Sequence, residues 1–156
     1  MVKIIRSLRD LDIAQLKNVY AESLNCGKDL LAAQQDFYGE LAHFFKEPSA
    51  YYAILQSEGD YVAALRVEPY RDGVIIAGLE TAPTHRRMGY AKKLLSAVVQ
   101  QMPSGVMIYS HVDKKNQPSI SVHAACEFER KLEHAVFLDG SVSTKFCTFI
   151  KITPAQ

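Results

Sequence analysis

Apolar residues in the middle of the chain change their spacing near residue 81, and this change predicts a strand followed by a helix. Residues 74–79 read Val-Ile-Ile-Ala-Gly-Leu and follow the turn signal Asp72-Gly73, which is typical of a short buried strand that we extend to residue 81. From residue 91 the apolar side chains recur at helical spacing, at Ala91, Leu94, Leu95, Val98, Val99 and Met102. This second pattern predicts an amphipathic helix.

Similar patterns on both sides of this unit predict the remaining elements. Strands are expected at 2–7, 50–56, 61–68 and 106–112, and helices at 10–24, from the break at 25–29 to about 46, and at 117–126. Segments 130–138 and 142–152 form a closing hairpin around Asp139-Gly140. Hairpins make the early strands antiparallel, and helical crossovers make the centre parallel. The expected fold is α/β, with a mixed α+β central sheet and about four flanking helices.

The turn between the central strand and its helix is basic and holds one glycine. It contains Arg86, Arg87 and Gly89, and the helix begins directly after it. The first N–H groups of a helix lack intrahelical partners and favour anions, and glycine lets the backbone approach a phosphate without a Cβ between them. The turn therefore predicts a pyrophosphate site. It has neither the Gly-Lys-Ser/Thr ending of a Walker loop nor the three glycines of a dinucleotide fingerprint.

Composition restricts the class of protein. The 156 residues suit one domain spanning 1–156, and a formal net charge of +1 argues against nucleic-acid or anionic-membrane partners. Frequent charges in the first ten residues argue against a signal peptide, and no apolar run is long enough to span a bilayer. Cys26, Cys126 and Cys147 are an odd set without C-x-x-C spacing, so we expect buried thiols in a reducing cytoplasm rather than a disulfide framework or a metal site.

Two segments resemble motifs of one enzyme superfamily. Residues 86–91, Arg-Arg-Met-Gly-Tyr-Ala, resemble the R/Q-x-x-G-x-G/A motif of the GNAT N-acetyltransferases, with alanine in the last slot. Downstream, Asn116, Ser119 and Val122 match the superfamily pattern N-x-x-A/S-x-x-aliphatic-Y. The resemblance covers roughly residues 50 to 152, and the front third matches only in layout.

The second motif departs from the superfamily at two places. His123 stands where most members have tyrosine, as in acyltransferases similar to the phosphinothricin-acetyltransferase type, and Glu127-Phe128 replaces Gly-Phe. The superfamily tyrosine is thought to protonate the departing thiolate of the cofactor, so the resemblance implies that His123 is a catalytic acid. The alternative is a histidine that packs against the cofactor and takes no part in the chemistry.

The resemblance implies acetyl-CoA (coenzyme A) as cofactor. Backbone donors of the 87–91 segment would hold its diphosphate, and the pantetheine arm would pair where the superfamily's fourth strand splays from the fifth. The expected cofactor-binding residues are Leu79, Glu80, Thr81, Arg86, Arg87, Met88, Gly89, Tyr90, Ala91, Asn116 and Ser119. For the two arginines the alternative is a solvated basic turn.

Glu80 is the leading candidate for the catalytic base. A carboxylate is unusual in an apolar strand, and desolvation would raise its pKa toward values useful for taking a proton from an amine. Alternatively, Glu80 faces solvent or pairs with Arg66 on the next strand. Arg66 itself is either an ion-pair partner or a site for an acceptor carboxylate, and His111 is either a second catalytic candidate or a strand-end histidine.

These expectations favour an acetyl-CoA-dependent N-acetyltransferase acting on a small-molecule amine by direct attack on the thioester. A backbone N–H near Thr81 would stabilise the oxyanion. A protein or peptide N-acetyltransferase and a non-catalytic acyl-CoA-binding protein are the alternatives. The partner expected is a small amine rather than nucleic acid or membrane, and the sequence leaves a homodimer open.

Overall fold

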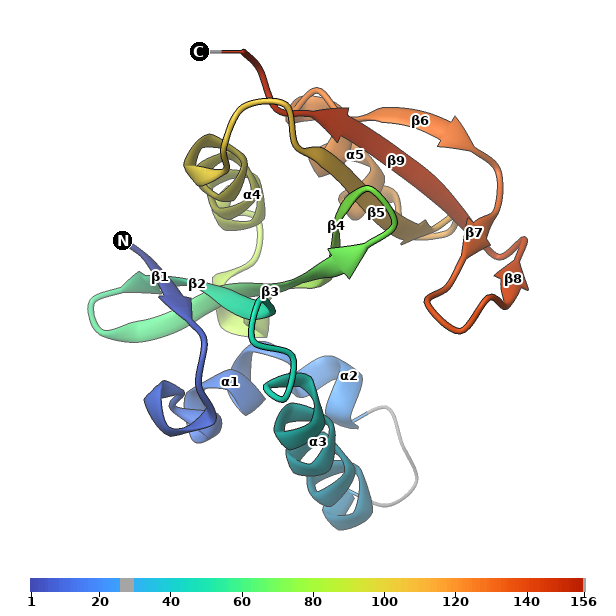
Figure 1. Cartoon of the computed structure of the whole chain (residues 1–156). Helices are drawn as coiled ribbons and strands as arrows, with labels where there is room; N and C mark the ends of the chain where they lie inside the picture. The colour runs from blue at the N-terminus through green and yellow to red at the C-terminus, as the bar shows by residue number, and fades with distance from the viewer. Residues whose placement is uncertain (26–29, 156) are drawn as a thin grey trace.

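A seven-stranded mixed sheet organises the chain in the computed structural model, which describes residues 1–25 and 30–155. Its order is β1-β2-β3-β4-β5-β9-β6 (Figure 1). The strands are β1 (Val2–Ile5), β2 (Tyr51–Ser57), β3 (Asp60–Tyr70), β4 (Gly73–Thr81), β5 (Met107–Asp113), β6 (Glu129–Leu132) and β9 (Phe146–Ile152). Only β4 and β5 pair in parallel among the described strands, so the expected mixed sheet is confirmed.

Helices cover both faces of this sheet. They are α1 (Ile13–Val19), α2 (Ala21–Asn25), α3 (Leu30–Phe44), α4 (Tyr90–Gln101) and α5 (Gln117–Ala125), with 3₁₀ turns at Leu8–Asp10 and Pro83–His85. In Figure 1, α1, α2 and α3 lie below the sheet, and α4 and α5 lie above it. Leu94, Leu95 and Val98 of α4 are buried in the upper core, whereas Leu16 and Leu41 are buried in the lower one. The sheet therefore lies between two hydrophobic cores.

The helix expected at 10–24 is wrong in its boundaries. It begins at Ile13 because the Asp12 side chain caps it, accepting a hydrogen bond from Gln15 N at 3.1 Å. At Tyr20 the backbone leaves helical geometry, and α2 follows as a separate element. The described residues therefore contain five α-helices rather than about four. Of the predicted break at 25–29, residues 26–29 lie outside the described residues.

The closing hairpin pairs as expected but divides into two parts. β6 pairs antiparallel with β9, while β7 (Ala135–Val136) and β8 (Val142–Ser143) form a separate two-stranded sheet. A register shift between Arg130 and Leu132 interrupts the ladder, and Thr148 Oγ1 donates a 2.7 Å hydrogen bond to the carbonyl oxygen of His134 beside it. The pattern of apolar residues in the sequence does not predict this irregularity.

The divergence of β4 from β5 creates the central cleft. These strands pair only from Val74–Ile76 to Ile108–Ser110, although both continue beyond that point. Gly78 lies two residues after Ile76, the last residue paired with β5, and has a φ of 63°; the β3–β4 register shifts between Ala64 and Arg66. A bulge at this position bends β4 away from β5. The remaining edge of β4 is thus open toward the cleft.

The described residues also bear on the cysteine prediction. Cys126 and Cys147 are buried free thiols, as expected, whereas Cys26 lies outside the described residues. None of the helices in the described residues is long and apolar enough to cross a membrane.

Candidate functional site

A cavity of about 740 Å³ runs along the basic turn, which we define as residues 82–89. We call it the turn cavity. Every residue predicted to bind the cofactor lines it except Met88, whose side chain is 60% exposed outside it. Six further lining residues lie outside the predicted cofactor-binding set: Glu22, Ser23, His85, Lys92, Pro118 and Val122. Elements from both ends of the chain therefore build one cavity.

The backbone of the basic turn forms a concave set of N–H donors. Left-handed φ values of 62° at Arg87 and 76° at Gly89 turn successive N–H groups toward one side. Lys93 N is the first donor of α4 to bond within the helix, at 3.0 Å to Gly89 O. Within the described residues, the N–H groups of 87–92 donate no hydrogen bond to the chain.

Space for a ligand exists beside these donors. A Cβ built on Gly89 meets no heavy atom of the chain within 4 Å. A diphosphate binds to N–H groups that lack partners at the start of a helix and that it can approach freely. The basic turn offers both, so it fits the nucleotide end of coenzyme A.

The two arginines of the turn have different surroundings. Arg86 forms an ion pair with Glu22 of α2, and its Nε lies 3.5 Å from Thr81 O. Arg87 is exposed and forms no ion pair within the described residues. Arg87 is therefore the guanidinium that is available to an anion in this conformation.

The far side of the turn cavity is the start of α5. Asn116 caps this helix, and its Oδ1 accepts a 3.2 Å hydrogen bond from Ser119 N. The amide nitrogen of Asn116 remains a donor toward the cavity that the residue lines. Across from it, the β5-facing edge of β4 is unpaired after Ile76. An extended, amide-rich arm fits between these polar groups.

Glu80 lies where this cavity meets a second one. Its Oε1 accepts a 2.6 Å hydrogen bond from Ser23 Oγ of α2, and its Oε2 is buried without a partner in the described residues. Burial raises the pKa of Glu80, while the bond from Ser23 and the charge of Arg86 oppose that rise. The predicted alternative of a pair with Arg66 is wrong, because the Arg66 guanidinium approaches Glu68 instead, at 3.6 Å.

His123 is buried, and both of its ring nitrogens have partners. Nδ1 lies 2.7 Å from the carbonyl oxygen of Ser119, which can only accept, so Nδ1 carries the proton. Nε2 then accepts from the hydroxyl of Ser110 on β5, at 2.8 Å. Burial lowers the pKa of His123, against the effect of the Ser119 bond. The ring is thus neutral and packs against Phe128 and Phe149.

The second cavity, of about 370 Å³, lies on the face of the sheet covered by α1–α3. We call it the sheet-face cavity. It shares five lining residues with the turn cavity: Ser23, Leu79, Glu80, Asn116 and Ser119. Tyr20 lines it and donates a 2.6 Å hydrogen bond to Gly78 O at the bulge of β4. An apolar strand interrupted by glycine indicates such a bulge, but no sequence signal identifies its partner Tyr20.

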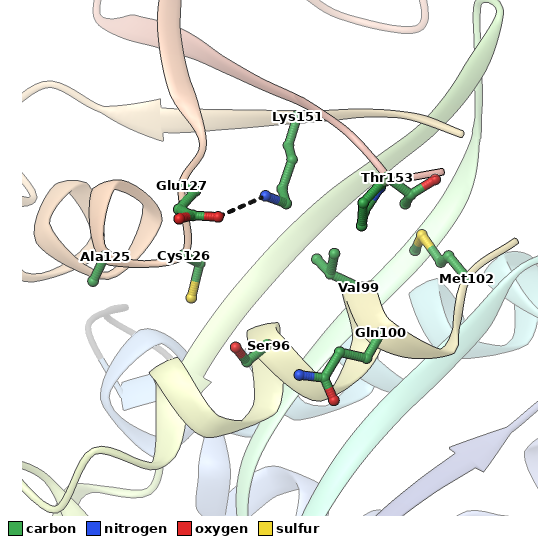
Figure 2. Close-up of a pocket in the computed structure, with 10 residues that line it drawn as sticks. Ser96, Val99, Gln100, Met102, Ala125, Cys126, Glu127, Lys151 and Thr153 are labelled. Atoms are coloured by element: carbon green, nitrogen blue, oxygen red, sulfur yellow. Dashed lines mark ion pairs between the residues drawn. The ribbon is translucent and has the colours of Figure 1, made fainter. Parts of the chain in front are cut away.

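A third cavity, of about 410 Å³, lies at the other end of α4 and shares no lining residue with the first two. Figure 2 shows Lys151 directed toward Glu127 at its mouth, with their charged atoms 3.6 Å apart, and Ser96 and Gln100 on α4 opposite. None of the predicted site residues lies there.

Comparison with known proteins agrees with this geometry. The model of the Acetyltransferase (GNAT) family matches residues 13–128. The chain belongs to this family. Acetyl-CoA is the cofactor of GNAT acetyltransferases, and acetyl-CoA-dependent transfer of an acetyl group to an amine is their general activity. A search among curated proteins finds no match for the chain.

Solved GNAT structures share the fold of this chain at low sequence identity. A chimera of the Vibrio cholerae spermidine N-acetyltransferase SpeG and hSSAT has a TM-score of 0.70 at 12% identity, covering 97% of this chain and 95% of that one. The ribosomal-protein-alanine N-acetyltransferase of Brucella melitensis has a TM-score of 0.63 at 16% identity, covering 96% and 99%. The yncA protein of Salmonella typhimurium, solved with its cofactor acetyl-CoA, has a TM-score of 0.64 at 12% identity, covering 99% and 95%. These similarities establish the fold of the chain. They do not identify its acceptor substrate.

Proposed function

We propose that this GNAT chain acetylates the amine of a small molecule by direct attack on the acetyl thioester. The observation that carries the proposal is the position of Glu80, which lines both the turn cavity and the sheet-face cavity. An acceptor amine must lose its proton where the acceptor and cofactor sites meet, and a carboxylate there is suited to take it.

The turn cavity supplies the cofactor site in this proposal. Backbone N–H groups from Arg87 to Ala91 bind the diphosphate, and the Arg87 guanidinium adds a charge-assisted contact. Leu79, Glu80 and Thr81 offer the open edge of β4 to the pantetheine amides, and Asn116 and Ser119 face it. When bound, acetyl-CoA supplies the activated acetyl thioester.

Glu80 and the β4 backbone carry the chemistry that follows. Burial raises the pKa of Glu80, which makes it a stronger base, and its unpartnered Oε2 accepts the ammonium proton directly or through water. A backbone N–H near Thr81 stabilises the negative charge that develops on the carbonyl oxygen. The acid role of His123 stays a prediction. Its two nitrogens, which contact Ser110 and Ser119, support the alternative in which His123 takes no part in the chemistry.

Two features distinguish this function from its alternatives. The volume of the sheet-face cavity, about 370 Å³, suits a small molecule better than a folded protein's terminus. A buried carboxylate oxygen without a partner is costly to maintain, which is expected of a working base rather than of a chain that only binds acyl-CoA.

The test compares Glu80→Gln with the exposed hairpin variant Glu58→Gln. Release of coenzyme A thiol is followed with acetyl-CoA and a panel of small amines and peptides, and acetyl-CoA affinity is measured by calorimetry. Glu80→Gln is expected to lower turnover about 10²- to 10⁴-fold with affinity unchanged. Wild-type activity on peptides alone, or equal activity of Glu80→Gln and Glu58→Gln, would contradict the proposal.

A further inference from the structure

Two buried side-chain atoms lack a hydrogen-bond partner in the described residues, and both belong to the sheet-face cavity. They are Oε2 of Glu80 and Nε2 of His111. Buried polar atoms in folded proteins are nearly always paired, so two orphans lining one cavity point to a ligand with polar groups at two places. The first place, at Glu80, is where the acceptor amine belongs under the proposed function.

Arg66 contributes a cation to the same cavity. Its register partner on β4 is Ala77, and its Nη1 lies only 3.0 Å from the position of a Cβ built on Gly78. The guanidinium therefore rests against the bulge, on the face of the sheet that α1 covers. Arg66 Nε has one carboxylate within ion-pair distance among the described residues, Glu68 at 3.6 Å. Both Nη atoms are without an ion pair there, and 38% of the side-chain surface is exposed.

The separation of the two charged groups limits the size of the ligand. Glu80 is in register with Ala64 on β3, two positions from Arg66, and both side chains line the same cavity. Two positions along a strand correspond to roughly 7 Å. A small molecule with a short chain between its polar groups spans that distance.

The other described acidic residues that line the sheet-face cavity form no ion pair with Arg66. Asp113 already accepts from Lys115 N at 2.9 Å and pairs with Lys145 at 3.5 Å. Glu40 is exposed on α3. Among the described residues that line the cavity, Glu80 is consequently the carboxylate with a buried, unpartnered oxygen, and Arg66 is the guanidinium.

On the basis of the proposed function, we propose that the acceptor is a small amino acid, with its amine at Glu80 and its carboxylate at Arg66. A guanidinium presents a planar fork that matches a carboxylate, and that of Arg66 lies against the bulge. His111, in its Nε2–H form, donates a further hydrogen bond to the same carboxylate. A diamine of equal length would instead place a second cation against Arg66.

The test uses matched pairs of acceptors that differ only in the carboxylate. Phenylalanine is compared with phenethylamine and 4-aminobutyrate with propylamine, within a wider set of α-, β- and γ-amino acids. Thiol release gives kcat and KM for wild type, Arg66→Gln, Arg66→Lys and the exposed control Arg9→Gln. Circular dichroism and acetyl-CoA calorimetry establish that each variant is folded.

The expected result is turnover of amino acids in preference to their decarboxylated partners. Arg66→Gln should raise KM for the amino acids about 10- to 100-fold and leave the simple amines unaffected. Arg66→Lys keeps the charge, so its KM for the amino acids should lie between those of wild type and Arg66→Gln. Arg9→Gln should have the same KM as wild type.

Three results would overturn the proposal. The first is a preference for the decarboxylated amines, and the second is an equal loss for both classes in Arg66→Gln; in either case the proposed acetyl transfer to small amines would still stand. The third is turnover of neither class by protein that binds acetyl-CoA, which counts against the proposed function as well.

Discussion

Ser23 Oγ donates a 2.6 Å hydrogen bond to Oε1 of Glu80, joining the short helix α2 to the end of β4. This bond lowers the pKa of Glu80, whereas burial, the larger effect, raises it. The proton affinity of the proposed base is therefore set by two segments more than fifty residues apart in the chain.

Ser23→Ala is expected to shift the acid limb of the kcat/KM profile to higher pH. Without the Ser23 bond the pKa of Glu80 rises further, and a base acts only when deprotonated, so activity on the acid side falls. Rate profiles against pH for Ser23→Ala and the exposed control Ser104→Ala check this. If the acid limbs of Ser23→Ala and Ser104→Ala coincide, Glu80 is not the base.

His123 is expected to make the fold less stable in mild acid. Its pKa in the folded protein is lowered by burial, so below its usual value of about 6.5 the unfolded chain binds a proton that the folded chain does not. Stability is then full at neutral pH and decreases as the pH falls through that value. Thermal unfolding of wild type at pH 7.5 and pH 5.5 should show the loss, and His123→Phe should show less of it. His111, whose pKa is also lowered, contributes to the loss that remains.

The same variant separates the two roles of His123. His123→Phe leaves Ser110 Oγ and Ser119 O without a partner, which is expected to cost about 1–3 kcal/mol of stability. Because the ring is neutral with both nitrogens occupied, the alkaline limb of kcat should keep its position. Disappearance of that limb would instead establish His123 as the acid.

Glu127→Gly is expected to stabilise the protein by about 1 kcal/mol, since a left-handed residue other than glycine is strained. Glu127 has a φ of 65° and follows α5, where Phe128 N bonds to His123 O at 2.9 Å and Glu127 N to Ala124 O at 3.0 Å. This is a Schellman ending, which favours glycine. The ion pair with Lys151 is weak, because the Glu127 side chain is 87% exposed. Chemical denaturation checks the gain; Glu129→Gly, in the extended strand β6, should lose stability.

Arg87→Gln is expected to weaken acetyl-CoA binding more than Arg86→Gln. Arg86 is already paired with Glu22, so a phosphate has to displace that carboxylate, whereas Arg87 is exposed and unpaired within the described residues. Loss of one charge-assisted contact corresponds to about a tenfold change in Kd. Calorimetry on both variants gives the comparison, and the reverse order would show that Arg86 exchanges Glu22 for the cofactor.

Local patterns in the sequence predict the strand, turn and helix that line the turn cavity. A strand, a basic turn with glycine and an amphipathic helix occupy adjacent residues, so the geometry of 86–91 depends little on the rest of the chain. Glu80 and Asn116 are close enough to these motifs to be identified with them.

The acceptor half depends on contacts between distant segments, which periodicity does not encode. Tyr20 meets Gly78 and Ser23 meets Glu80 only because α1 and α2 pack against the bulged end of β4. The orientation of His123 is similar: its position on α5 was predictable, but its bond to Ser110 depends on how α5 packs against β5.

Binding of acetyl-CoA by the backbone of residues 87–91 is the central claim, and calorimetry on Gly89→Ala against Gly140→Ala tests it most directly. Both glycines have positive φ, 76° and 87°, and in both a Cβ meets nothing within 4 Å, so the two substitutions strain the backbone alike. We predict that Gly89→Ala weakens acetyl-CoA binding at least about tenfold while Gly140→Ala binds as wild type does. Equal affinity of the two variants, or a wild-type protein that does not bind acetyl-CoA, would contradict the account.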